Sequence, residues 1–148
     1  MRGKASATVT IERPIGEVFS YVTDVEKMPG WMSGVRAARL VSKEMGRGAR
    51  YVLDYIQGWR PSELEIEVTE FEPPRSFASR IFRGPFAYEG RIELREVETA
   101  TEVTNTIEAG PDSLSTRVVT WLLGPLLLRS FTRRLVVELE DLRRAIAA

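Results

Sequence analysis

The sequence predicts an α+β domain in which a strongly curved antiparallel sheet wraps around a long C-terminal helix. Three observations predict this fold class. Residues 63–69 alternate apolar and polar side chains, as a half-buried strand does. Short turns separate this strand from its neighbours, which is typical of an antiparallel meander. The last third of the chain, residues 112–148, carries apolar residues at spacings of three and four that line one stripe of a helix: Leu128, Phe131, Leu135, Leu139, Leu142 and Ile146.

The remaining elements follow from local spacing. Residues 7–12 alternate and predict the first strand, and Pro14 occupies a position that the start of a helix tolerates. The apolar residues of 15–22 recur at helical spacing, and Val25, Met28 and Trp31 form a second apolar turn. Six more strands are expected at residues 35–43, 49–57, 63–69, 76–83, 86–97 and 101–109, and the closing helix begins at Asp112 or Ser113.

Two groups of charged residues are expected at the surface. Glu63, Glu65 and Glu67 alternate with the apolar residues of their strand, so they resemble a paired-carboxylate site only in the linear sequence. The charged residues of the last helix fill the gaps between its apolar positions and are expected to lie mainly toward water: Arg133, Arg134, Glu138, Glu140, Asp141, Arg143 and Arg144.

Composition limits the chemistry that is available. The 148 residues are most simply one domain, residues 1–148, without a repeat or a linker. The 21 basic residues balance 21 acidic ones, which argues against a general electrostatic contact with nucleic acid. The chain has no cysteine and no histidine, so disulfides, thiolate metal sites and histidine-dependent nucleophilic catalysis are excluded. Zinc lacks its usual ligands, and we expect neither a metal nor a cofactor.

The apolar segments do not predict a membrane protein. The longest nearly apolar run, residues 118–128, holds eleven residues, whereas a helix that spans a bilayer needs about 20. The first six residues are polar, and they do not form the apolar core that a signal peptide has. We therefore expect a soluble, cytoplasmic protein.

Several motifs resemble START-like (SRPBCC) domains of the polyketide cyclase/dehydrase type. The resemblance begins with residues 11–24, which read IERPIGEVFSYVTD, and continues with the Met-Pro-Gly-Trp of residues 28–31. It extends to Gly48 before an aromatic strand, to the VTEFEPP of residues 68–74, to Gly90 and to the final helix. One departure is Ala100-Thr101, where the family usually has Gly-Thr, and it affects only turn geometry.

The resemblance implies a specific architecture but no single activity. It implies the helix-grip fold, in which a curved seven-stranded antiparallel sheet surrounds a C-terminal helix, two short helices follow the first strand, and an apolar cavity lies between sheet and helix. The family includes carriers, cyclases, hydroxylase domains and stress-related co-chaperones. Membership in it therefore indicates the fold better than the function.

The third strand carries the first candidate site residues. Tyr51, Leu53 and Tyr55 share one face, and Trp59 lies just beyond the strand. Aromatic side chains with a polar tip suit a cavity that holds a mostly apolar ligand by one or two hydrogen bonds, and they equally suit simple core packing. If the opposite face points inward instead, Asp54 becomes a buried acid and a candidate for proton transfer.

The sixth and last strands add a cavity wall. On the sixth strand Tyr88 and Gly90 share a face with apolar residues, and the missing side chain of Gly90 indicates close approach of a helix or a ligand, or a bulge. Asn105 faces inward on the last strand, where its amide needs a partner in the protein, in water or in a ligand. The complete set of candidate ligand-binding residues is Tyr51, Leu53, Tyr55, Trp59, Phe77, Tyr88, Gly90, Asn105, Trp121 and Leu128.

Three functions remain open from the sequence. The favoured one is binding of a hydrophobic small molecule of the aromatic polyketide, lipid or isoprenoid type. The second is a cyclase or dehydratase in which Tyr51, Tyr55 or Asp54 moves protons and Arg80 or Arg83 holds an enolate, although a solvated strand face is the simpler interpretation of both arginines. The absence of histidine removes the usual near-neutral base and favours binding. The third is a co-chaperone or protein-interaction module.

The first half of the last helix is apolar around nearly its whole circumference. Pro125 removes a helical hydrogen bond and is expected to kink the helix. Val119, Leu123 and Leu126 would leave an apolar patch on the side away from the sheet. A homodimer contact is the favoured interpretation of this patch. The alternatives are a lid loop, a membrane-surface contact, or cover by the loop at residues 28–34.

Overall fold

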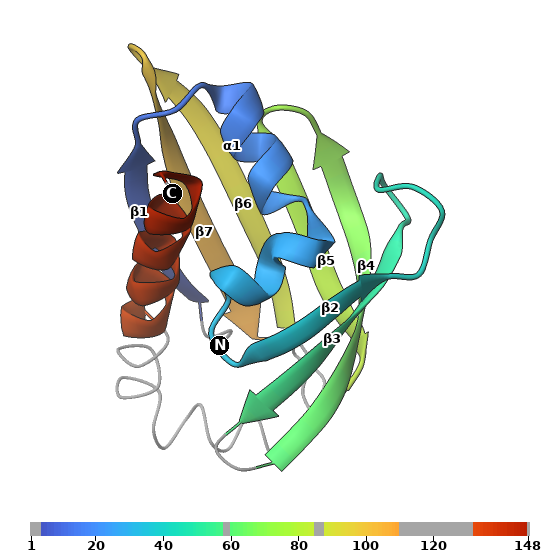
Figure 1. The fold of residues 1–148 in the computed structure, drawn as a ribbon. Coiled ribbons are helices and arrows are strands. Elements are labelled where there is room, and N and C mark those ends of the chain that lie inside the picture. The colour runs from blue at the N-terminus through green and yellow to red at the C-terminus, as the bar shows by residue number, and fades with distance from the viewer. Residues whose placement is uncertain (1–3, 58–59, 85–87, 110–131, 148) are drawn as a thin grey trace.

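A computed structural model describes residues 4–57, 60–84, 88–109 and 132–147. Within them, seven strands form one antiparallel sheet in the order β1-β7-β6-β5-β4-β3-β2. The strands β2 to β7 follow the chain as a meander, and β1 pairs with β7, so β1 and β2 are the edges (Figure 1). Their bounds are β1 (Lys4–Ile11), β2 (Val35–Leu40), β3 (Arg50–Gln57), β4 (Arg60–Glu72), β5 (Ser76–Arg83), β6 (Tyr88–Val97) and β7 (Ala100–Ala109).

Three helical elements lie on the concave face of the sheet (Figure 1). The helix α1 (Ile15–Val22) follows β1 directly and buries Val18, Phe19 and Val22. The 3₁₀-helix η1 (Val25–Gly30) follows α1, and its first turn is capped by Asp24, whose side chain accepts a hydrogen bond from the backbone N–H of Glu26 at 3.1 Å. The C-terminal helix occupies residues 132–147 in the described part of the chain. This arrangement confirms the expected fold class.

The strands lie close to the expected ranges. The strand β4 spans thirteen residues between the turn group at residues 58–61 and Pro73-Pro74, where the sequence predicts its end, and clear alternation covers only residues 63–69. The strand is this long because it has two partners along different parts of its length. Its residues from Arg60 to Glu67 pair with β3, and those from Glu65 to Glu72 pair with β5. Pairing extends a strand into positions where side-chain alternation is no longer visible.

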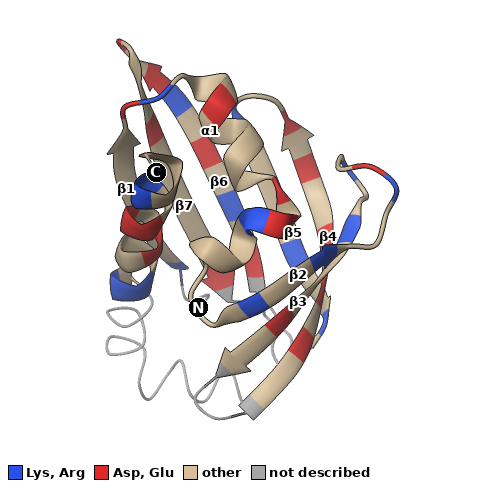
Figure 2. Ribbon diagram, in the orientation of Figure 1, with Lys and Arg blue, Asp and Glu red and all other residues tan. Residues whose placement is uncertain are grey.

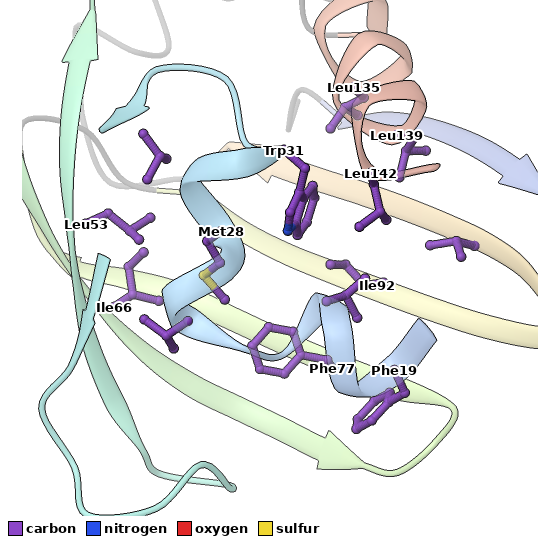
Figure 3. Close-up of a cluster of buried hydrophobic side chains, with 14 of the residues drawn as sticks. Phe19, Met28, Trp31, Leu53, Ile66, Phe77, Ile92, Leu135, Leu139 and Leu142 are labelled. Atoms are coloured by element: carbon purple, nitrogen blue, oxygen red, sulfur yellow. The ribbon is translucent and has the colours of Figure 1, made fainter. Parts of the chain in front are cut away.

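One apolar core fills the space between the sheet and the helices (Figure 3). The predicted stripe of the C-terminal helix contributes Leu135, Leu139, Leu142 and Ile146, all of them buried, while Leu128 and Phe131 lie outside the described residues. The sheet contributes alternate residues of every strand, as in β1, where every second residue is buried. The helix and the concave face therefore bury one another's apolar surface.

Charged residues are spread along the strands (Figure 2), and in β4 they alternate with buried residues, so their side chains lie on the opposite, convex face of the sheet. Arg80 pairs with Glu67 at 3.1 Å, and Arg83 pairs with Glu65 at 3.2 Å. Hydrogen bonding to Arg80 is the main reason why the pKa of Glu67 lies below its ordinary value. The expected surface positions of Glu63, Glu65 and Glu67 are confirmed, and both arginines belong to a solvated strand face.

Candidate ligand-binding site

The third strand turns its aromatic face inward. Tyr51, Leu53 and Tyr55 are buried and belong to the core cluster. Asp54 is exposed on the convex face, where it pairs in register with Glu63 and lines a half-open hollow of about 460 Å³. The alternative phase, in which Asp54 would be a buried acid, is therefore wrong. The packing of the alternating face against η1 and the C-terminal helix decides the phase, and periodicity alone carries no information about it.

Tyr51 is a protonated phenol inside the core. Burial raises the pKa of Tyr51 to about 12, and a side-chain hydrogen bond with Ser79 offsets part of that effect. At neutral pH the hydroxyl group donates and accepts hydrogen bonds but does not act as a base. Tyr51 thus supplies a polar point on an otherwise apolar wall.

A polar joint connects β3 to the C-terminal helix. Arg134 enters the interior from the first described turn of that helix, and its Nη2 donates hydrogen bonds to the hydroxyl oxygen of Tyr55 and to the carbonyl oxygen of Ser33, the latter at 2.7 Å. The guanidinium also lies over the Tyr55 ring, 5.3 Å from its centroid. Arg134 Nε pairs with Glu138 Oε1 at 3.3 Å, and Glu138 Oε1 accepts the backbone N–H of Ser33 at 3.0 Å.

Glu138 is buried, so its expected position toward water is wrong. Only 7% of the residue is exposed. Burial raises the pKa of its carboxyl group, and the positive charge of Arg134 and the Ser33 N–H oppose that shift. The two partners that it finds explain why a carboxylate is tolerated in this position, because a buried charge must be paired and hydrogen-bonded.

Gly34 allows this joint to close. Its φ of +79° lies in the left-handed region, and a Cβ atom there would stand 2.8 Å from both the Ile56 carbonyl oxygen and the Tyr55 Cε2 atom. The same Cβ would lie 3.3 Å from Arg134 Nη2. A residue without a side chain is therefore required where the loop after η1 meets β3 and the helix.

Trp31 is a site residue that the sequence pattern did not reveal. It follows η1, and its ring lies in the core between η1 and the C-terminal helix (Figure 3). Only 2% of the residue is exposed, and its Nε1–H is buried without a hydrogen-bond partner, the single such side-chain atom in the described ranges. The interpretation of Trp31 as an apolar turn residue is correct for its ring, but it does not account for the indole Nε1–H.

The comparisons with known proteins agree with this geometry. Residues 2–147 match the model of the family described as polyketide cyclase / dehydrase and lipid transport. The chain belongs to this family. A search of curated proteins finds no match.

Several solved structures have the same fold as this protein but low sequence identity to it. TTHA0849 from Thermus thermophilus is 18% identical, with 97% of each chain covered and a TM-score of 0.79. The Zhui aromatase/cyclase from Streptomyces sp. R1128 is 14% identical, with 99% of this chain and 94% of that chain covered and a TM-score of 0.79. A START superfamily protein from Mycobacterium smegmatis is 16% identical, with 91% and 97% covered and a TM-score of 0.63. At these identities the likeness shows the fold.

In this family member, the fold brings part of the predicted site together. Six of the predicted residues lie on the inner face of the sheet: Tyr51, Leu53, Tyr55, Phe77, Gly90 and Asn105. Tyr88 begins β6, and its side chain is outside the described set. The other predicted residues of the site and of the dimer contact lie outside the described residues: Trp59, Trp121, Leu128, Val119, Leu123 and Leu126.

Phe77 belongs to an aromatic cluster near α1. Its ring centroid lies 6.3 Å from that of Phe71, which in turn lies 5.4 Å from that of Phe19.

In the described ranges no group of three acidic residues is placed to hold a metal ion, and no described helix has the length and apolarity to cross a membrane. The inner face of the described sheet is thus an apolar surface with a few isolated polar groups.

Proposed function

We propose that the protein binds a hydrophobic small molecule, of the aromatic polyketide, lipid or isoprenoid type, between the concave face of the sheet and the C-terminal helix. One observation carries this proposal. The concave face is mostly apolar, and few polar groups of the sheet reach it: the hydroxyl group of Tyr51, the hydroxyl group of Tyr55, which accepts a hydrogen bond from Arg134, and the amide of Asn105. A binding site for an apolar molecule has this composition, because apolar walls provide affinity and a few polar groups fix orientation.

The same groups are poorly suited to acid–base catalysis. Tyr51 has a pKa far above neutral, and Asp54 is exposed on the convex face. Tyr55, Arg134 and Glu138 do converge, but they hydrogen-bond to one another and to Ser33. Arg80 and Arg83 are paired with glutamates on the convex face. These observations favour binding over the cyclase or dehydratase alternative.

Binding of a neutral fluorescent probe tests the proposal. N-phenyl-1-naphthylamine should bind the wild-type protein with a rise in fluorescence. Gly90 pairs with Ser79 and Ile107 on the inner face, so Gly90→Leu adds an apolar side chain to the proposed site and should weaken binding at least about tenfold.

Glu89→Leu is the matched control, because Glu89 is the exposed neighbour of Gly90 on the same strand. This variant should bind the probe as the wild type does. Circular dichroism should establish that both variants are folded. A wild-type protein that does not bind the probe, or a folded Gly90→Leu variant with unchanged affinity, would contradict the proposal.

Two further properties belong to the proposal. We infer a cytoplasmic, soluble carrier, supported by the balanced charge and the short apolar runs of the sequence. We also infer a homodimer that forms through Val119, Leu123 and Leu126, supported by the apolar circumference of the segment that carries them.

A further inference from the structure

The indole Nε1–H of Trp31 is an unsatisfied donor in the core. Buried polar side-chain atoms nearly always have a hydrogen-bond partner, since the group loses its water on burial and gains nothing in exchange. In the described part of the chain this N–H is the one side-chain nitrogen or oxygen that is buried and unpartnered. An exception of this kind at an otherwise well-satisfied core indicates a partner that binds there.

The backbone at Trp31 is held by the short helix before it, and the ring is buried in the core. The backbone N–H of Trp31 donates to the carbonyl oxygen of Met28 at 3.2 Å, and Met28 itself is buried. The cap at Asp24 holds the start of the same short helix. The backbone of Trp31 is therefore fixed, and close packing in the core keeps the ring buried.

The Trp31 ring belongs to the core between the sheet and the helices, which is where the proposed ligand would bind. Figure 3 shows Trp31 between η1 and the C-terminal helix, in the core cluster that also contains Leu142 and Ile92. On the next strand Asn105 pairs with Ile92 and is also buried. These neighbours belong to the core between the sheet and the helix, so the unsatisfied donor lies among the residues of the candidate site.

The charges near Trp31 select a neutral partner. Ser33, two residues after Trp31, donates its backbone N–H to the buried carboxylate of Glu138. The guanidinium of Arg134 is held by Glu138, Tyr55 and the Ser33 carbonyl oxygen. A ligand carboxylate in this region would be repelled by Glu138 and would lose its hydration, whereas an uncharged oxygen has a much smaller desolvation cost.

We propose that the Nε1–H of Trp31 donates a hydrogen bond to an uncharged oxygen, a carbonyl, ether or hydroxyl group, on an otherwise apolar ligand. This inference rests on the proposed function and makes it more specific, because it distinguishes ketone-like or quinone-like molecules from pure hydrocarbons and from fatty acid anions. Trp31 is then the residue that orients the ligand.

A matched pair of probes tests the inference. Fluorene and 9-fluorenone share one shape and differ in a single carbonyl group, and their affinities follow from displacement of N-phenyl-1-naphthylamine. In the wild type, the ratio of the fluorene to the fluorenone dissociation constant should exceed that in Trp31→Phe by between about threefold and tenfold, as one hydrogen bond provides. Phenylalanine retains an aromatic ring but has no N–H.

A spectroscopic measurement on the wild type makes the test independent of the stability of the variant. In protein with ¹⁵N-labelled tryptophan, the Trp31 indole resonance is assigned by its loss in Trp31→Phe. Fluorenone should move its proton signal downfield, as hydrogen bonding does, and fluorene should not. The smaller ring of Trp31→Phe changes apolar packing with both probes alike, so this change cancels in the ratio of their dissociation constants.

The outcomes separate the two proposals. If wild-type protein binds fluorene and fluorenone but the affinity ratio is the same in Trp31→Phe, or the indole proton signal does not move with fluorenone, the inference about Trp31 is wrong and the proposed binding of an apolar molecule stands. If the wild type binds neither compound nor the displaced probe, the proposed function is contradicted and the inference fails with it.

Discussion

Glu138 is a charged residue that is buried, although its charge predicts exposure to water. Its charge predicts the solvated side of the helix, yet it lies three residues after Leu135 and four before Leu142, which places it within the apolar stripe. The structure buries it there and supplies the backbone N–H of Ser33 and the guanidinium of Arg134. Spacing is the better guide here, and the partner from residues 31–34 is not visible in the sequence.

The raised pKa of Glu138 predicts a dependence of stability on pH. Because the folded state holds the proton more tightly than the unfolded state, the contribution of Glu138 to stability is complete below the ordinary pKa of 4.5 and decreases as pH rises through the higher, folded-state pKa. Glu138→Gln removes this titration. The free energy of unfolding of the wild type, relative to that of Glu138→Gln, should therefore fall as pH rises above 4.5 and then level off.

Urea unfolding at a series of pH values from about 4.5 to 8 measures this difference. Glu67 and Glu70 have lowered pKa values and give the opposite slope in the acid range, but they are present in both proteins and cancel in the comparison. Equal pH dependence in the two proteins would show that the buried carboxyl group titrates as it does in the unfolded chain.

At the scale of the element, the C-terminal helix depends on packing. Its described part has two distinct sides: Leu139 and Leu142 are almost completely buried, whereas Val136 and Val137 are 47% and 49% exposed. The helix also makes the polar contacts of Arg134 and Glu138 with β3 and with Ser33. The apolar contacts hold the helix on the sheet, and the polar joint fixes how its first described turn is placed.

Leu139→Ala and Leu142→Ala should each lower the free energy of unfolding by about 2–5 kcal/mol, because each removes buried methyl groups and leaves a cavity. Val136→Ala and Val137→Ala on the exposed side should change it by no more than about 0.5 kcal/mol. Chemical denaturation of the four variants measures both sets. Equal losses on the two sides would mean that the helix does not pack on the sheet as described.

At the scale of the whole molecule, one curved sheet holds both the core and the proposed site. The antiparallel order places alternate residues of every strand on the concave face, and η1 and the C-terminal helix cover that face. Ion pairs such as Arg80–Glu67 and Arg83–Glu65 lie on the convex face, which is exposed to solvent. In the described part the large apolar residues that are exposed are Val41, Val97, Val136 and Val137, and the sequence predicts a further apolar patch within residues 118–128.

The proposed homodimer gives a prediction at this scale. Sedimentation velocity at about 10 μM protein should show a dimer, because an apolar patch of this kind is stabilised by association. Leu123→Glu and Leu126→Glu should shift the protein to a monomer, and Val136→Glu, on an exposed part of the described helix, should not. A monomeric wild type at this concentration would exclude the dimer.

The sequence by itself determined the fold class, the order of the elements, the core side of the C-terminal helix and the family, because apolar periodicity and turn residues are local properties. It also excluded histidine and cysteine chemistry. Only the tertiary structure decided that Tyr51 and Tyr55 face inward and Asp54 outward, that Glu138 is buried beside Arg134, and that the Trp31 N–H has no partner. These properties depend on which segments, distant in the sequence, come into contact. The residue pattern of one segment does not predict which segments will pack against it.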